Sequence, residues 1–279
     1  MTESASSKHP RSRSVSRAVL AVAGRGVLAV GTVASTVLGV GAVAVFGEPS
    51  AAPQAPPLAR QSVEPAPVEP GSSAPGRSGT ASEPGDESGE DPVRDWANEV
   101  AAVVDVPSRA LVSYVNADLA MRSRSPECGV DWATLAGIGR VESDHGRYNG
   151  RRLGADAVPS SPIIGVPLDG GEDVRAITDT DDGVLDGDTV HDRAVGPMQF
   201  IPSTWAKWST DGSGDGVGDP HNLDDAAMAA ARYLCAGGRD MRSGDGWWSG
   251  VMSYNNSVSY ARKVFSLAER YAQAGSRDE

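Results

Sequence analysis

The stretch GVDWATLAGIGRVESDHG, residues 129–146, decides how this chain is interpreted. It predicts a helix over 131–144, because its apolar residues recur at helical spacing. Spacings of three, four and three residues place on one side of this helix Trp132, Leu135, Gly139 and Glu142. That side is apolar and faces the core, so a carboxylate on it is unusual. The sequence therefore marks Glu142 as a candidate functional residue.

Glu142 has two interpretations that the helix alone does not separate. Burial and the negative end of the helix dipole would both raise the pKa of its carboxyl group. A carboxylic acid that stays protonated near neutral pH can donate a proton to a glycosidic oxygen. Alternatively, Glu142 is a buried structural carboxylate that Arg140 or Arg193 neutralises.

The globular part of the chain, residues 93–275, predicts a mainly α domain. Apolar residues with helical spacing begin at about residue 93, and Pro107 is suited to open a second helix. Further helices are expected over 202–208, 224–236 and 257–274. The intervening stretch 150–192 is rich in Gly, Pro and Asp, and a short hairpin within 163–190 is the only strand structure expected there.

The N-terminal segments indicate export. Residues 1–25 form a basic tail, and residues 26–46 contain no charge over a length that can cross a bilayer as a helix. The basic residues before this segment predict a single-pass anchor in the cell membrane, with the domain on the extracytoplasmic side. A secretory signal cleaved after Ala42-Val43-Ala44 is the alternative, and the protein would then be secreted.

Residues 47–92 consist mainly of Pro, Ser, Gly, Ala and Glu. Such a composition cannot bury enough apolar surface to offset its ordering entropy, so we expect a disordered linker that gives the domain reach. The formal net charge of the whole chain is −12, although its N-terminal tail is basic. An acidic globular part argues against a nucleic-acid partner.

The chain has two cysteines, Cys128 and Cys235, both in the globular part. In an exported protein this even number predicts a disulfide bond, and two buried free thiols are the alternative.

Three motifs occur in the order found in lysozyme-like lytic transglycosylases. They are Glu142-Ser143, then Gly196-Pro197-Met198-Gln199-Phe200 followed by Ile201-Pro202-Ser203-Thr204-Trp205, and finally Ser253-Tyr254-Asn255-Asn256. Over residues 93–273 the chain most closely resembles the membrane-bound lytic murein transglycosylase B family, in an actinobacterial form.

This resemblance implies a goose-type lysozyme-like (SLT) fold and a peptidoglycan substrate. The bond cleaved would be the β-1,4 bond between N-acetylmuramic acid and N-acetylglucosamine. Glu142 would be the single acid and base, forming a 1,6-anhydro end without a cofactor in the chemistry. The residues expected to bind substrate are Ser143, Met198, Gln199, Tyr254 and Asn255, although Met198 is also suited to packing.

The resemblance has one departure and leaves other functions open. The family usually places a serine nine residues before the glutamine, where this chain has Val190. A hydrolytic muramidase on the same fold would leave reducing ends instead of anhydro ends. A non-catalytic wall-binding module is a further alternative, although binding alone needs no buried acid.

An acidic loop at 211–219 has the spacing of an EF-hand loop. Its candidate calcium ligands are Asp211, Ser213, Asp215, the carbonyl of Val217, and Asp219. The twelfth position is Asn222 instead of a bidentate Glu, so the ligand set is incomplete unless Asp224 or Asp225 folds back. A structural Ca²⁺ and a metal-free turn are therefore both open. The second acidic loop, 179–188, resembles no full ligand set and is interpreted as an edge of the substrate cleft, with a second bound ion as the alternative.

Overall fold

The structure is a computed structural model that describes residues 63–77, 91–171 and 175–276. The chain divides into two units, 1–53 and 54–279, and every described residue belongs to the second. None of the helices in these described ranges is long and apolar enough to cross a membrane. The predicted anchor at 26–46 lies outside the described residues.

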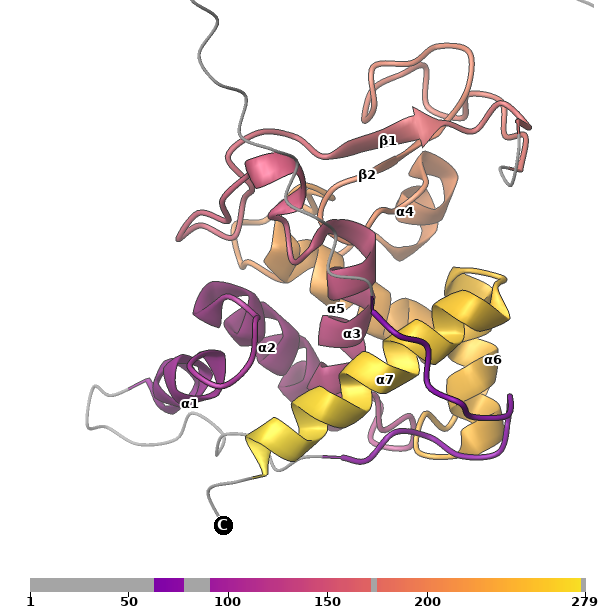
Figure 1. Ribbon diagram of the computed structural model, residues 1–279. Helices are drawn as coiled ribbons and strands as arrows, with labels where there is room; N and C mark the ends of the chain where they lie inside the picture. The colour runs from indigo at the N-terminus through magenta and orange to yellow at the C-terminus, as the bar shows by residue number, and fades with distance from the viewer. Residues whose placement is uncertain (1–62, 78–90, 172–174, 277–279) are drawn as a thin grey trace, which may run out of the picture. The chain divides into compact units, whose positions relative to one another are not determined.

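The described unit is mainly helical, as predicted, with one short sheet (Figure 1). In chain order its elements are α1 (Pro92–Ala101), α2 (Ser108–Arg124), α3 (Trp132–Ser143), η1 (Tyr148–Gly150), β1 (Ile164–Pro167), β2 (Arg193–Val195), α4 (Pro202–Trp208), α5 (Leu223–Leu234), η2 (Ala236–Gly238), α6 (Gly244–Tyr254) and α7 (Val258–Gly275).

Helix α3 is the centre of the core. Every residue from 132 to 139 is buried, so this helix is enclosed on all sides instead of presenting one apolar stripe. It packs along α7, as Figure 1 shows, and also against α2, which in turn contacts α1 and α5. Asp131 caps the helix by accepting a hydrogen bond from the backbone N–H of Ala133, at 2.9 Å. This packing holds the C-terminal end of α3 in a defined place.

The predicted disulfide bond is confirmed. Cys128 precedes α3 and Cys235 follows α5, and the bond between them joins Cα atoms 5.5 Å apart. It links two segments of the core that are 107 residues apart in sequence. Closing so long a loop restricts the unfolded chain and stabilises the fold by about 4–5 kcal/mol in the chain-entropy description.

The sheet and helix α6 differ from expectation. Strand β1 pairs antiparallel with β2, whose residues 193–195 lie just beyond the expected hairpin region of 163–190. Helix α6 was not expected, because its sequence GDGWWSGVMSY contains three glycines, which are poor helix formers. At Gly244 the close approach of the Gly71 carbonyl, far away in the sequence, leaves no room for a Cβ atom, so tertiary packing requires the glycine. Local propensity is thus overridden by contacts that the sequence does not display.

Residues 63–77, which we call the strap, depart from the expected disordered linker. The strap lies against α6 and α7 (Figure 1), where its Pro75 is buried. The backbone N–H of Ala66 donates to the Arg262 carbonyl at 3.1 Å, and Trp248 Nε1 donates to the Ser73 carbonyl at 3.0 Å. These hydrogen bonds satisfy backbone groups that composition alone suggested would stay in water.

Candidate active site

Glu142 lies in the last turn of α3 and is partly buried. Directly after it, Ser143 is buried and its hydroxyl donates a hydrogen bond to the Pro197 carbonyl at 2.6 Å. The same oxygen accepts a hydrogen bond from the backbone N–H of Gly146 at 2.8 Å. Ser143 therefore connects the end of α3 to the turn that carries Gln199, and this is a positioning role.

The Glu142 carboxylate has one hydrogen-bond partner in the described part of the chain. Tyr260, in the first turn of α7, donates its hydroxyl to Oε1 at 2.5 Å. Burial raises the pKa of Glu142 to about 7, and the hydrogen bond from Tyr260 opposes this rise. Near neutral pH, protonated and ionised forms of the carboxyl group are thus both well populated.

The alternative interpretation of Glu142 as an arginine-neutralised structural acid is wrong. Arg140 forms ion pairs with Asp105 and Asp144, and Arg193 forms one with Asp188. Among the described residues no ion pair reaches Glu142, and no charged neighbour contributes to the shift of its pKa.

The tight turn between Val195 and Phe200 presents Gln199. Two backbone hydrogen bonds close the turn, from Val195 N–H to the Phe200 carbonyl at 2.8 Å and from Phe200 N–H to the Val195 carbonyl at 3.0 Å. Gln199 has a left-handed backbone, with φ of 51°, and its Nε2 donates to the Gly196 carbonyl at 2.9 Å. Gln199 as a whole is partly buried.

Tyr254 supports the same turn. At the end of α6, its hydroxyl donates a hydrogen bond to the Met198 carbonyl at 2.8 Å. Its pKa lies well above the ordinary value, first because of burial and then because of the nearby Glu142 charge. Met198 itself is fully buried. Tyr254 therefore orients the turn, and its direct hydrogen bond goes to backbone instead of to the acid.

Asn255 has a different environment. It is exposed and caps α6 through its backbone N–H, which donates to the Val251 carbonyl at 3.1 Å. Within the described ranges its side chain makes no hydrogen bond to protein. The Asn255 side chain is exposed and follows Tyr254 directly in the sequence, and its substrate-binding role stays a prediction. Val190, at the position of the family's serine, is 63% exposed and offers no hydrogen bond to the acid.

Sequence reasoning missed Tyr260. Its residue type is common on the buried face of an amphipathic helix, and no motif includes it. The one available signal was its position five residues after Asn255, close to the start of the next helix. Only the packing of α7 on α3 brings its hydroxyl to Glu142.

The 211–219 loop is closed by hydrogen bonds to carboxylates. Asp225 is fully buried and its two oxygens accept from the backbone N–H groups of Gly212, Ser213 and Asp219, at 2.8, 2.8 and 2.9 Å. Asp211 accepts hydrogen bonds from the backbone of Gly214 and Gly216. Asp225 thus folds back toward the loop, but it binds backbone N–H groups there. The carboxylates of the predicted calcium loop are not gathered into a group of three within the described chain, so calcium binding stays a prediction.

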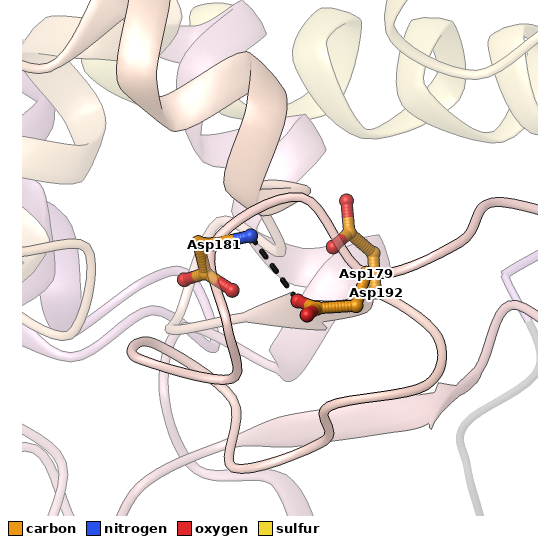
Figure 2. Close-up of side chains that lie close together, drawn as sticks. All are labelled: Asp179, Asp181 and Asp192. Atoms are coloured by element: carbon orange, nitrogen blue, oxygen red, sulfur yellow. Dashed lines mark hydrogen bonds between the residues drawn. The ribbon is translucent and has the colours of Figure 1, made fainter.

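A different set of carboxylates does converge, in the loop between β1 and β2. Asp179, Asp181 and Asp192 each place one oxygen within 4.8 Å of the others. Figure 2 shows these three side chains close together. Asp192 is fully buried and accepts hydrogen bonds from the backbone N–H and the hydroxyl of Thr180, both at 2.8 Å. Among the described residues, these three carboxylates form the group that is suited to hold a cation. Asp179 and Asp181 belong to the acidic loop 179–188, whereas Asp192 lies four residues beyond it.

Part of this site lies in a segment of the chain that matches a known family. Residues 193–251 match the family described as Transglycosylase SLT domain. The matched segment includes the turn with Gln199, but it does not include Glu142, and it ends before Tyr254. A comparison with curated proteins finds no match.

Solved structures of lytic transglycosylases share a remote likeness with the chain. One is Slt35 from Escherichia coli in complex with bulgecin A, 16% identical, with a TM-score of 0.37 over 64% of this chain and 78% of that chain. A calcium complex of the same protein is 16% identical, with a TM-score of 0.38 over 64% and 79%. SltB3 from Pseudomonas aeruginosa in complex with NAG-anhNAM-pentapeptide is 18% identical, with a TM-score of 0.35 over 64% and 67%.

Proposed function

We propose that this protein is a lytic transglycosylase that cleaves the β-1,4 bond between N-acetylmuramic acid and N-acetylglucosamine in peptidoglycan. The observation that carries the proposal is Glu142, a partly buried carboxyl group with a pKa of about 7 and a single hydrogen-bond donor, Tyr260. The match of residues 193–251 to a transglycosylase domain supports the class of substrate.

The chemistry follows from one carboxyl group acting twice. Protonated Glu142 donates its proton to the glycosidic oxygen as the bond from C1 to that oxygen breaks. The resulting carboxylate then accepts the proton of the muramic C6 hydroxyl, while the C6 oxygen forms a new bond to C1. The product carries a 1,6-anhydro ring, and the carboxyl group returns to its protonated state. A pKa near 7 suits both steps, because neither the acid nor its conjugate base is strongly disfavoured at neutral pH.

The hydrogen bond from Tyr260 makes the two carboxyl oxygens of Glu142 different from each other. Its hydroxyl is bound to Oε1, whereas Oε2 accepts no hydrogen bond from a described residue. Oε2 is therefore the oxygen that delivers and later recovers the proton. No second carboxylate contributes to the pKa shift of Glu142, which fits a reaction without a carboxylate nucleophile.

The cellular location proposed is extracytoplasmic, where peptidoglycan lies. The disulfide bond between Cys128 and Cys235 supports this, because such bonds persist in oxidising compartments. We propose that residues 26–46 hold the protein at the cell membrane and that the catalytic unit acts in the wall.

The test is the mass of the released fragments. The full chain is incubated with purified peptidoglycan, and fragments one water lighter than the reducing form are expected. Reducing ends would show a hydrolytic muramidase, and binding without any release would show a wall-binding module. The variant Glu142→Gln should release fragments about 10²–10⁴ times more slowly. The matched control Glu99→Gln changes an exposed acid on α1 and should keep full activity.

A further inference from the structure

A buried polar pair packs at the C-terminal end of α3, the helix that carries the proposed catalytic acid. His145 is fully buried, and its Nδ1 shares a hydrogen bond of 3.1 Å with the hydroxyl of Tyr114, also fully buried, on α2. That hydroxyl passes over Gly139 of α3, where a Cβ atom would overlap it. Helix α3 therefore lacks a side chain one turn before Glu142, at the point where the tyrosine reaches the histidine.

The backbone that contains His145 has an unusual conformation. Three successive residues after α3 have left-handed conformations, with φ of 54° at Asp144, 57° at His145 and 82° at Gly146. Left-handed conformations are costly for residues other than glycine and persist only where surrounding contacts impose them. The backbone N–H of His145 also donates to the Gly139 carbonyl at 2.9 Å, which ends the helix. The turn begins two residues after Glu142, so its conformation sets where the last helical turn stops.

The surroundings of His145 suit a structural role and do not suit proton transfer. Burial lowers the pKa of its ring well below the ordinary value, and the nearby charges of Arg147 and Arg140 lower it further, so the ring is neutral at physiological pH. The ring is fully buried, and within the described part of the chain its hydrogen bond goes to Tyr114 and not to Glu142. Its Nε2 and the buried hydroxyl of Tyr271 do not bond to each other, although the two rings are neighbours with centroids 6.2 Å apart.

We infer that His145, held by Tyr114, is a positioning residue for Glu142: the buried hydrogen bond fixes the left-handed turn and thereby the direction of the carboxyl group. This inference rests on the proposed function. Since a small displacement of a catalytic group lowers the rate much more than it weakens binding, the effect is expected in kcat and not in KM.

The experiment compares variants that remove this hydrogen bond with variants that keep a hydrogen-bonding group in its place. Tyr114→Phe removes the hydroxyl, His145→Phe removes the ring nitrogens, and His145→Asn keeps a polar atom near the position of Nδ1 and tolerates a left-handed backbone. Tyr271→Phe is the matched control, since it deletes a hydroxyl from the same buried cluster that does not bond to His145. Steady-state rates on a soluble peptidoglycan glycan fragment and melting temperatures are measured for the full chain.

Tyr114→Phe and His145→Phe should each lower kcat about tenfold or more with little change in KM. Their double variant should be no slower than the worse single variant, and His145→Asn should recover most of the rate. Should His145→Phe fail to fold, the decision rests on Tyr114→Phe, the smaller change. Unchanged kcat in Tyr114→Phe, or a loss equal to that of Tyr271→Phe, overturns the inference. A wild-type protein that releases no fragments contradicts the proposed function instead, so the two failures are distinguishable.

Discussion

Glu142 at the end of α3 and Asp225 near the start of α5 are both carboxylates taken at least partly out of water, yet their surroundings differ. Asp225 is fully buried and accepts three backbone N–H groups. Among the residues that the structure describes, Glu142 accepts one hydrogen bond, from the hydroxyl of Tyr260, and burial raises its pKa to about 7.

The two carboxylates differ in how many hydrogen-bond donors replace the water that each has lost. Donors that point at an ionised carboxylate replace the water it lost and stabilise its charge. A carboxylate with one donor is poorly compensated, and it therefore takes up a proton more readily. Asp225 accordingly organises a loop, whereas Glu142 is suited to exchange a proton.

The largest effect on stability is expected at Asp225. Asp225→Asn replaces one acceptor oxygen with an NH₂ group that faces backbone donors, so buried N–H groups lose their partner. We expect the free energy of unfolding to fall by about 2–4 kcal/mol, measured by urea denaturation. Asp211→Asn, at an exposed position of the same loop, is the control and should cost less. An Asp225→Asn protein as stable as wild type would contradict a structural role for this carboxylate.

Glu142→Gln should change stability in the opposite direction at alkaline pH. The pKa of Glu142 is about 7 in the folded protein and near its ordinary value of 4.5 when unfolded. The folded state therefore binds more protons between these values, and stability decreases as pH rises from about 4.5 through 7. Replacing Glu142 with Gln removes this pH-dependent loss of stability, which amounts to at most about 3 kcal/mol above pH 8. Unfolding curves at pH 5 and pH 8 test it, and an equal pH dependence in both proteins would refute the raised pKa.

Tyr260→Phe removes the one donor on Glu142. Because the hydrogen bond from Tyr260 lowers the pKa of Glu142, its loss should raise that pKa further. The acid then stays protonated to higher pH, and the alkaline limb of the activity profile should move upward by up to about one unit. Measured pH–rate profiles decide this. A limb that stays in place, or moves to lower pH, would show that Tyr260 does not tune the acid.

The smallest effect concerns calcium and the loop that Asp225 closes. If the 211–219 loop binds a structural Ca²⁺, chelation should lower the melting temperature by a few degrees and added Ca²⁺ should restore it. Asp215→Asn should remove this response, since Asp215 is one of the predicted ligands. An unchanged melting temperature after chelation would contradict a structural Ca²⁺ in this loop. The hydrogen bonds between Asp225 and the backbone would then be sufficient to hold it.

Much of the fold could be predicted from periodicity. Helix α3 and helix α7 repeat apolar residues at helical spacing, and their bounds in the structure lie close to those expected. Helix α6 could not be predicted, since its first glycine, Gly244, is required by a contact with the distant Gly71. The position of the strap could not be predicted either, because its composition does not indicate the hydrogen bonds that its backbone forms with α6 and α7.

The sequence by itself determined that Glu142 is an acid on a core-facing helix side and that Gln199 and Tyr254 belong to ordered motifs around it. Only the tertiary structure decided what touches the acid: Tyr260 is its donor, whereas Arg140 and Arg193 pair with other carboxylates. Local sequence records spacing along one element, which is enough to assign a side of a helix. The pKa of a carboxyl group depends instead on burial and on donors from other elements, and these exist only once α3 and α7 are packed together.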